Sequence, residues 1–378
     1  MPMSLREMNL RVFQRRPIPH VFFQPRFEPW FDWHTMFGSL PPKLQGLSLR
    51  EVYDSLGASM RTVHYYTGQP DPVTVSYSDR IKISVRESAE LRIITFETPV
   101  GALTETQQLT IDKTWRTVEF PAKSPADLPA LRYLVGERVF HFSPEAFRTG
   151  AAFLGERGVP QFWVPKSPYF ALAQQLMRYE HFIYALNDER AAMEEIMALI
   201  DASYDPLYAE LAGSGLLQIL NFGENVAMAY LSPRNYERYC LPWYTQRAEQ
   251  LRAGGIFTHI HIDGYFRALL PYLASMPFDG LEALTPEPQG DVTLEEMAEA
   301  MGDKILLDGI PAVLFLDHHP REQLYACVER IVALFHPRLV LGISDELPEA
   351  GGEESFDRMA WVADYARSHP SAPAIVEP

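Results

Sequence analysis

The sequence predicts an α/β fold, and three observations favour a (β/α)8 barrel within this class. Eight short apolar runs alternate with longer helical patterns along the chain. Most of the runs are continuously apolar, which is typical of strands buried on both faces of a parallel sheet. The chain has 378 residues, of which 47% are hydrophobic, so one large barrel can enclose its own core. We therefore predict a single barrel domain over residues 1–378; a doubly wound open sheet is the alternative.

The predicted elements follow one another in a regular order. Strands are expected at 20–24, 61–66, 161–164, 216–222, 256–262, 280–284, 304–309 and 338–344. Helices are expected at 181–211, 232–254, 293–302 and 320–335, the second with Ser232 or an adjacent residue as its cap and Pro233 at its first position.

Residues 71–121 break this order, because apolar and polar residues alternate there between turn signals. We expect antiparallel β-hairpins in this segment, inserted after the second strand and partly covering the barrel mouth. A small independent β-domain is the alternative.

The charge and the cysteine content exclude several classes of protein. The net charge is −16 and no basic run is longer than Arg15-Arg16, which argues against nucleic acid or an anionic membrane surface as a partner. Two cysteines are too few for a disulfide framework. No apolar run is long enough to span a membrane, and the N-terminus lacks the apolar core of a signal peptide. The expected location is therefore the cytoplasm.

Polar residues stand at or just after every predicted strand end, where barrels of this kind carry their reactive groups. In strand order they are Gln24 and Arg26, His64, Lys166, Asn221 and Glu224, His261 and Asp263, Glu282, Asp308, and Asp345. A rim with a purely structural role does not need such a series, so we expect a site at this end of the barrel.

The segment GGIFTHIHIDGYF (254–266) contains a candidate ligand pair. His261 and Asp263 are two residues apart, so in an extended chain they share a face, as does His259. Imidazole with carboxylate suits zinc, iron or manganese better than magnesium or calcium. A hydrogen-bonded His–Asp pair without metal is the alternative.

Arg26 lies in the aromatic-rich segment QPRFEPWFDWH, close in sequence to Trp30. A guanidinium group in such surroundings can bind a carboxylate or a phosphate of a substrate through two hydrogen bonds. A salt bridge to Glu28 or Asp32, with the aromatic residues covering the barrel end, is the alternative.

Several segments together resemble the uroporphyrinogen decarboxylase superfamily. They are SPYFALAQQLMRYEHFIYALNDE (167–189), LSPRNYERYCLPWYTQRAEQLRAGG (231–255), THIHIDG (258–264), LDGIPA (307–312) and GISDELP (342–348). The resemblance extends over roughly residues 5–370 and implies a (β/α)8 barrel. The superfamily contains metal-free porphyrinogen decarboxylases and zinc-dependent methyltransferases, which move methyl groups between a corrinoid and a thiol. The resemblance is also compatible with a homodimer.

The zinc motif of those methyltransferases is His-x-Cys-Gly, with a second Cys three residues before a Pro after the last strand. His261 matches the His, Asp263 occupies the first Cys position, and Asp345 occupies the second. The resemblance therefore implies a retained metal site with two carboxylates in place of two thiolates. Such ligands leave the metal a stronger Lewis acid, which favours polarising an oxygen over alkylating a thiol.

The decarboxylase branch matches less well at its own motifs. Of its N-terminal arginines at most one is matched, by Arg26, and the position of its catalytic Asp after strand two reads HYYTG (64–68). We therefore expect a metal-dependent, methyltransferase-like enzyme acting on a small molecule, with a corrinoid or corrinoid protein as an additional partner. A uroporphyrinogen decarboxylase and a non-catalytic tetrapyrrole-binding barrel are the alternatives.

The first hypothesis gives each candidate residue a role. The expected metal is zinc, or else iron or manganese. Its ligands would be His261, Asp263 and Asp345, and the catalytic candidates are Glu282, Glu224 and His64. The side chains expected to bind substrate are Arg26, Trp30, Lys166 and Asn221.

Overall fold

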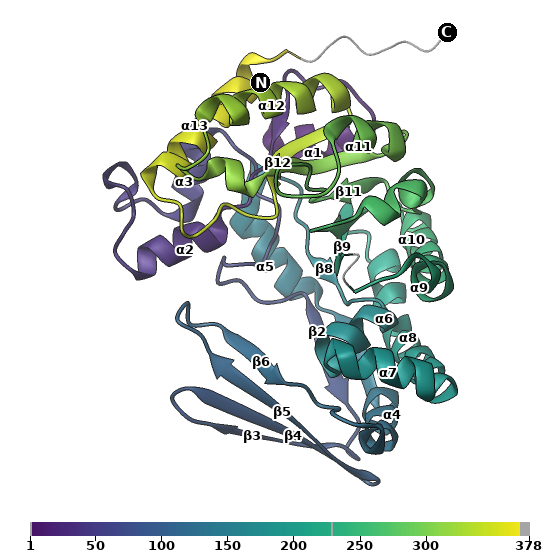
Figure 1. Ribbon diagram of the computed structural model, residues 1–378. Coiled ribbons are helices and arrows are strands. Elements are labelled where there is room, and N and C mark those ends of the chain that lie inside the picture. Colours follow the sequence, from purple (N-terminus) through teal and green to yellow (C-terminus); the bar gives the residue numbers. More distant parts are fainter. Residues whose placement is uncertain (1, 228–229, 371–378) are drawn as a thin grey trace.

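The computed structural model describes residues 2–227 and 230–370, and seven parallel strands form its central sheet (Figure 1). In spatial order they are β1 (Phe22–Phe23), β13 (Leu339–Ser344), β12 (Ile305–Pro311), β11 (Gly280–Glu282), β10 (Phe257–Ile262), β9 (Ile219–Val226) and β8 (Trp163–Val164). Each of these strands overlaps a predicted one. The α/β class and the mostly parallel sheet are therefore confirmed.

The predicted strand at 61–66 does not form a ladder of its own. Residues 59–63 instead run between β1 and β8: the Ser59 amide donates to the Phe23 carbonyl (3.0 Å), and the Val63 amide donates to the Gln161 carbonyl (2.9 Å). A single parallel bridge joins Thr62 to Gln161. This short segment occupies the gap between the two end strands of the sheet.

Thirteen α-helical segments are described within these residues. They are α1 (Leu5–Phe13), α2 (Glu28–Met36), α3 (Leu49–Leu56), α4 (Leu128–Gly136), α5 (Pro144–Leu154), α6 (Pro168–Ala171), α7 (Tyr179–Asp188), α8 (Arg190–Gly213), α9 (Pro233–Asn235), α10 (Leu241–Ala253), α11 (Leu294–Met301), α12 (Arg321–Phe335) and α13 (Glu353–Ser368). The helix predicted over 181–211 is divided at Glu189, whose backbone leaves the helical region. Ser232 does cap α9, accepting from the Asn235 amide. Among the described helices, none combines the length and apolar character needed to cross a bilayer.

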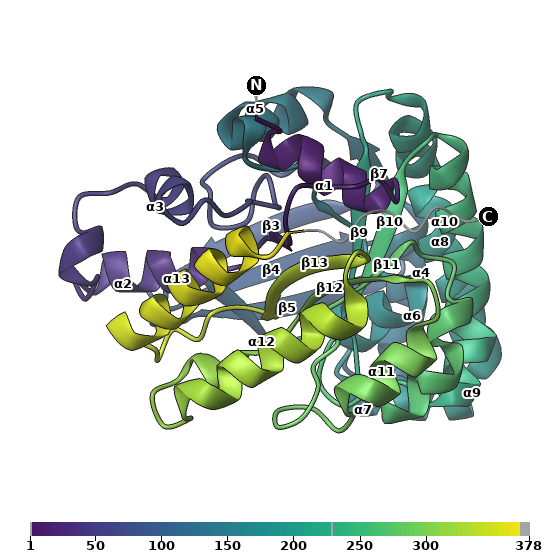
Figure 2. The ribbon, with the colours of Figure 1, turned by 90° about the horizontal axis from the view of Figure 1, so that it is seen from above.

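The core of the sheet is apolar at its amino end. Met8, Val12 and Phe13 of α1 pack on side chains of the strand starts, including Phe22 and Ile219. Figure 2 shows α1 lying across this end of the molecule. Beside this apolar packing, the buried Asn9 of α1 accepts hydrogen bonds from the Val159 amide (3.2 Å) and the Gln161 side chain (3.4 Å).

The inserted β-structure is larger than the sequence pattern predicts. Four antiparallel strands form one sheet: β3 (Lys82–Glu87), β4 (Leu91–Thr98), β5 (Gly101–Leu109) and β6 (Trp115–Glu119). However, β2 (Val73–Tyr77) pairs with β7 (Arg138–Phe142), beyond the predicted boundary at residue 121. Pairing across that separation is set by tertiary packing, and a local alternation pattern does not contain it.

Gly158 shows how tightly residues 59–63 are held. A Cβ at this position would overlap the Met60 carbonyl oxygen, and the Ser59 hydroxyl would lie 2.7 Å away. We expect Gly158→Ala to lower the free energy of unfolding by about 1–3 kcal/mol, the usual cost of overpacking, as measured by urea denaturation. Gly213→Ala is the control, because a Cβ there meets nothing within 4 Å. Equal stability of the two variants would contradict this close packing.

Candidate active site

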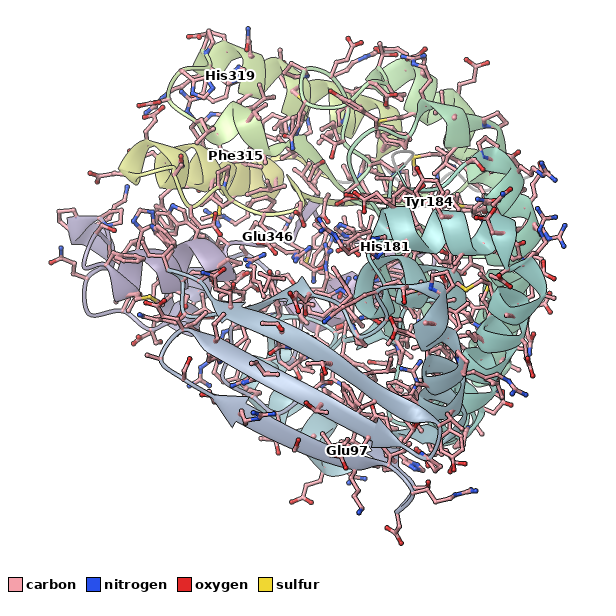
Figure 3. All side chains as sticks on the ribbon, turned by 60° about the horizontal axis from the view of Figure 1, so that its bottom comes forward. Glu97, His181, Tyr184, Phe315, His319 and Glu346 are labelled. Atoms are coloured by element: carbon pink, nitrogen blue, oxygen red, sulfur yellow. The ribbon has the colours of Figure 1, made fainter. Side chains whose placement is uncertain are left out.

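A cavity of ≈ 380 Å³ lies at the carboxyl ends of the strands. Its lining comes from β8, β9, β10 and β6 and from the segments after β1, after residues 59–63 and after β13: Arg26, Tyr65, Tyr66, Arg116, Trp163, Gly223, Asn225, His261, Asp345, Glu346 and Glu349. Arg116 belongs to β6, so the inserted sheet borders the cavity, as predicted. Figure 3 shows Glu346 near the middle of the view, next to the inserted sheet.

A buried charge network, made of Arg61, Glu282 and Asp308, lies beside this cavity. Arg61 donates to Glu282 Oε1 at 2.5 Å and to both oxygens of Asp308 at 2.8 and 3.1 Å. Its Nε donates to Gln24 Oε1 at 2.9 Å. All three charged residues are almost fully buried. Breaking such a network leaves uncompensated buried charge, so it fixes the strand ends relative to one another.

Glu282 also contacts both histidines of β10. Its Oε2 lies 3.0 Å from His259 Nδ1 and accepts from Asn221 Nδ2 at 2.5 Å, while its Oε1 lies 3.7 Å from His261 Nδ1. Burial opposes ionisation of Glu282, but the charge of Arg61 and the two imidazoles outweigh it and hold its pKa well below the usual value. Glu282 is therefore an anion that orients the two rings, and it carries no proton to donate near neutral pH.

His261 lies between two carboxylates that are distant in the sequence. Its Nε2 is 3.9 Å from Asp263 Oδ2 and 3.9 Å from Asp345 Oδ1. Burial lowers the pKa of His261, yet the nearby carboxylates of Asp263, Glu282 and Asp345 raise it to about 10. The His261 side chain is 5% exposed, whereas Asp263 and Asp345 are 31% and 53% exposed. The structure thus brings together the three predicted ligands at the cavity.

The donor set fits a divalent cation in residue type, but its side chains are spaced more widely than the ligands of a bound ion. Neighbouring ligands around tetrahedral zinc lie about 3.3 Å apart, given bonds of about 2.0 Å. Within residues 2–227 and 230–370, no group of three or more His, Cys, Asp or Glu side chains is placed so that it could hold a metal ion without rearrangement. Because Asp345 is half exposed, its carboxylate has room to rotate toward His261.

Arg26 holds the other side of the Asp345 carboxylate. Its NH1 lies 3.3 Å from Asp345 Oδ1, and its NH2 donates to Glu346 Oε1 at 2.5 Å. The guanidinium lies 5.3 Å from the centre of the Tyr65 ring and 5.7 Å from that of Trp163. Its buried Nε has no hydrogen-bond partner among the described residues. The predicted substrate-binding residue is therefore in the cavity and keeps a free donor.

Glu346 completes this wall of the cavity. Tyr65 donates to its Oε1 at 2.6 Å, the same oxygen that Arg26 contacts. Burial raises the pKa of Glu346 to about 7, against the opposing charge of Arg26. The Glu346 carboxyl group is therefore able to exchange a proton near neutral pH.

Three non-glycine residues have a positive backbone φ, one within β12 and two directly after the neighbouring strands β11 and β13. These are Ala283 (φ 61°), Asp308 (φ 73°) and Asp345 (φ 70°). Each such conformation costs of order 1–3 kcal/mol and persists only where the surroundings enforce it. Strain in or directly after three adjacent strands is typical of a functional site.

Glu224 and Lys166, two other predicted site residues, do not line this cavity. The Glu224 carboxylate accepts from the Ser167 amide (2.5 Å), the Ser167 hydroxyl (2.8 Å) and the Tyr244 hydroxyl (3.1 Å), so it is engaged at the start of α6. Lys166 donates to the carbonyls of Gly223 and Glu224 and borders an adjoining cavity of ≈ 410 Å³.

Three further candidates, Trp30, His64 and Asn221, contact neighbouring side chains and do not line the cavity. Trp30 is fully buried and donates to the Gly351 carbonyl, packing on Phe356 of α13. His64 packs edge-on against Trp163, and burial lowers its pKa. The Asn221 side chain is buried and donates a hydrogen bond to Glu282.

Sequence reasoning did not assign a site role to Arg61, Tyr65 or Glu346. Arg61 is the first residue of a predicted apolar strand, and an arginine is seldom fully buried unless it is paired. That rule is the one signal that points to Arg61. Tyr65 and Glu346 carry no local signal, because their roles depend on Arg26, which reaches them only in the folded chain.

The strands and the cavity define an α/β protein of the parallel-sheet class with a polar site at the carboxyl ends of its strands. The family model described as uroporphyrinogen decarboxylase (URO-D) matches residues 119–355, more than half of the sequence. The chain therefore belongs to the uroporphyrinogen decarboxylase family. The matched segment includes His261, Asp263, Glu282 and Asp345, whereas Arg26 lies outside it.

Solved structures with a similar fold include a methyltransferase from Methanosarcina mazei. It is 13% identical, with 96% of this chain and 99% of that chain covered and a TM-score of 0.58, which shows a shared fold. A putative vitamin-B12 independent methionine synthase from Listeria monocytogenes (13% identity, 93% and 98% covered, TM-score 0.42) is more distant. A B12-independent methionine synthase from Shewanella sp. W3-18-1 has 12% identity, the same coverage and a TM-score of 0.47. No curated protein matches the chain.

Proposed function

We propose that this protein is a metal-dependent, methyltransferase-like enzyme acting on a small molecule at the mouth of a (β/α)8 barrel. The single observation that carries the proposal is the convergence of His261, Asp263 and Asp345 at 3.9 Å spacings beside the cavity. The hydrogen bonds of residues 59–63 to β1 and β8 support a closed barrel with eight strand positions. The methyltransferase similarity is compatible with this fold.

In this proposal His261 Nε2, Asp263 and Asp345 hold the cation, zinc or else iron or manganese. A bound cation of this kind supplies a Lewis acid that polarises an oxygen or activates water. Glu282 faces Nδ1 of His261, so it keeps Nε2 directed toward Asp263 and Asp345, the outer-shell role that carboxylates have at many metal sites. The negative charge that raises the pKa of His261 also favours a cation at this position.

The cavity side chains bind and orient the substrate. Arg26 offers a guanidinium that lies beside the Tyr65 and Trp163 rings, which suits a carboxylate or another oxyanion. When Asp345 turns toward His261, Arg26 loses one partner and gains room for a substrate anion. A corrinoid or a corrinoid protein remains the proposed additional partner.

Metal binding tests the proposal directly. Purified protein is stripped with chelator and titrated with Zn²⁺, Mn²⁺ and Fe²⁺ by calorimetry. We expect one ion per chain, and a loss of affinity of at least about 10-fold in both Asp263→Asn and Asp345→Asn, the scale of losses seen when a supporting group is removed from a metal site. Asp317→Asn is the control, because Asp317 is exposed and outside the cavity. Affinity unchanged in the two cavity variants would refute the proposed ligand set.

A metal-free decarboxylase is the second candidate, favoured by the family match and by the buried free Nε of Arg26. Turnover of uroporphyrinogen by the chelator-treated protein would establish it and exclude metal dependence. We expect no turnover, because the second buried arginine, Arg61, is already occupied by Glu282 and Asp308.

A further inference from the structure

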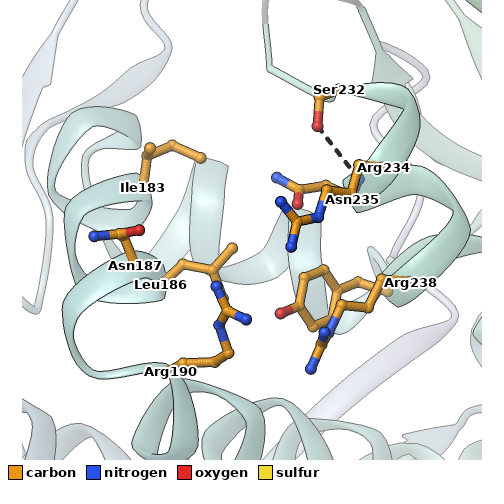
Figure 4. A pocket seen from close by; sticks show the side chains of 9 residues that line it. Ile183, Leu186, Asn187, Arg190, Ser232, Arg234, Asn235 and Arg238 are labelled. Atoms are coloured by element: carbon orange, nitrogen blue, oxygen red, sulfur yellow. Dashed lines mark hydrogen bonds between the residues drawn. The ribbon is translucent and has the colours of Figure 1, made fainter.

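A separate cavity of ≈ 240 Å³ lies between α7 and the helical segment that begins with α9 (Figure 4). Its lining consists of Ile183, Leu186, Asn187, Arg190, Ser232, Arg234, Asn235, Arg238 and Tyr239. It shares no lining residue with the cavity at the strand ends. None of the functions considered above uses it.

Three guanidinium groups face this cavity and no carboxylate lines it. Figure 4 shows Arg190 on one side and Arg234 and Arg238 on the other. Arg238 donates to Glu194 at 2.7 Å, at the rim. Within the described ranges, Arg190 and Arg234 have no carboxylate within 4.0 Å.

This concentration of positive charge is at odds with the rest of the chain, whose net charge is −16. Arg234 lies in α9 and Arg238 in the π-helical turn that follows it (Tyr236–Cys240); both line the cavity, where their like charges repel. An anion bound between them and Arg190 would remove that repulsion.

We propose that this cavity binds a phosphorylated small molecule. A phosphate group presents several acceptor oxygens and up to two negative charges, which match paired guanidinium forks. Neutral hydrogen-bonding groups are provided by Asn187, Ser232 and Asn235. Ile183 and Leu186 form an apolar wall for the organic part of the ligand.

The size and shape of the cavity favour a small ligand over an acidic protein. Its volume lies just below the range of about 300–1,000 Å³ that drug-sized ligands occupy. A protein partner instead requires a contact surface of about 800 Å² on each side. The proposal is independent of the metal site.

Calorimetric titration of the chelator-treated protein at constant ionic strength tests the proposal, with inorganic phosphate and phenyl phosphate as probes. We expect saturable binding of both, tighter for phenyl phosphate because of the apolar wall. The double variant Arg190→Gln/Arg234→Gln should weaken binding at least tenfold. Since Arg190 and Arg234 are exposed, the variant should keep its melting temperature; Arg234→Ala alone serves as the second variant.

Two matched controls locate the binding. Arg148→Gln removes an exposed arginine of α5 and should change nothing. Arg116→Gln removes an arginine of the strand-end cavity, and a loss of phosphate binding there would overturn the proposal. Absence of saturable binding, full binding by the double variant, or binding of polyglutamate but not phosphate would overturn it equally.

Discussion

Replacing Arg61 by methionine is expected to lower the free energy of unfolding by about 3–5 kcal/mol, as measured by urea denaturation at pH 8. The substitution leaves Glu282 and Asp308 buried without the cation that contacts both. Because removing one partner of a buried ion pair costs far more than replacing the whole pair, the double variant Arg61→Met/Asp308→Asn should lose less than the sum of the two single losses.

The pH dependence of this loss has a definite sign. Burial, the largest cause, raises the pKa of Asp308 to about 6 even with Arg61 beside it. Without Arg61 the pKa must rise further above its unfolded value, so protonation stabilises the folded variant. The deficit should therefore shrink as the pH falls from 8 to 5.

Arg148→Met is the control for the Arg61 prediction, since Arg148 is exposed and should tolerate the change within about 0.5 kcal/mol. A loss below about 1 kcal/mol in Arg61→Met would mean that the network contributes little to stability.

His261→Ala is expected to lower the affinity for the divalent ion by at least about 100-fold, because even outer-shell changes cost about 10–100-fold. His261 is the one proposed ligand that is nearly fully buried, so neither solvent nor a neighbouring side chain can easily replace it. Competition with a chelating dye measures the affinity. A second readout is the melting temperature, which a saturating ion should raise in the wild type and leave unchanged in the variant.

The matched control is His318→Ala, which removes an exposed histidine outside the cavity. If the affinity of His261→Ala stayed within threefold of that control, the ion would bind elsewhere and the proposed centre would be wrong.

The closeness of His261, in β10, to Asp263, directly after it, was predictable, because residues two apart in an extended chain share a face. Their relation to Asp345 was predictable only through the family motif, which links the end of β10 to the end of β13. Arg61 illustrates the limit of local reasoning: the segment reads as a strand, yet it forms only one bridge and supplies a buried cation instead.

Glu224 and Trp30 are the converse case: their sequence positions predicted a role in the site, but neither side chain lines the cavity. Both stand near a strand end in the sequence, but the Glu224 carboxylate is engaged with Ser167 and Tyr244, and the Trp30 indole packs on Phe356. Sequence position places a residue near the mouth, whereas the direction of its side chain follows from the turn and the neighbours it meets.

The sequence by itself determined the α/β class, most strand positions and the pairing of an imidazole with a carboxylate on β10, because burial and strand periodicity are local properties. Only the tertiary structure decided which polar residues converge, that Arg61 ties Glu282 to Asp308, and that β2 pairs with β7. Those contacts join residues far apart in the chain, and their geometry depends on strand register and on the positive backbone φ at Asp308 and Asp345.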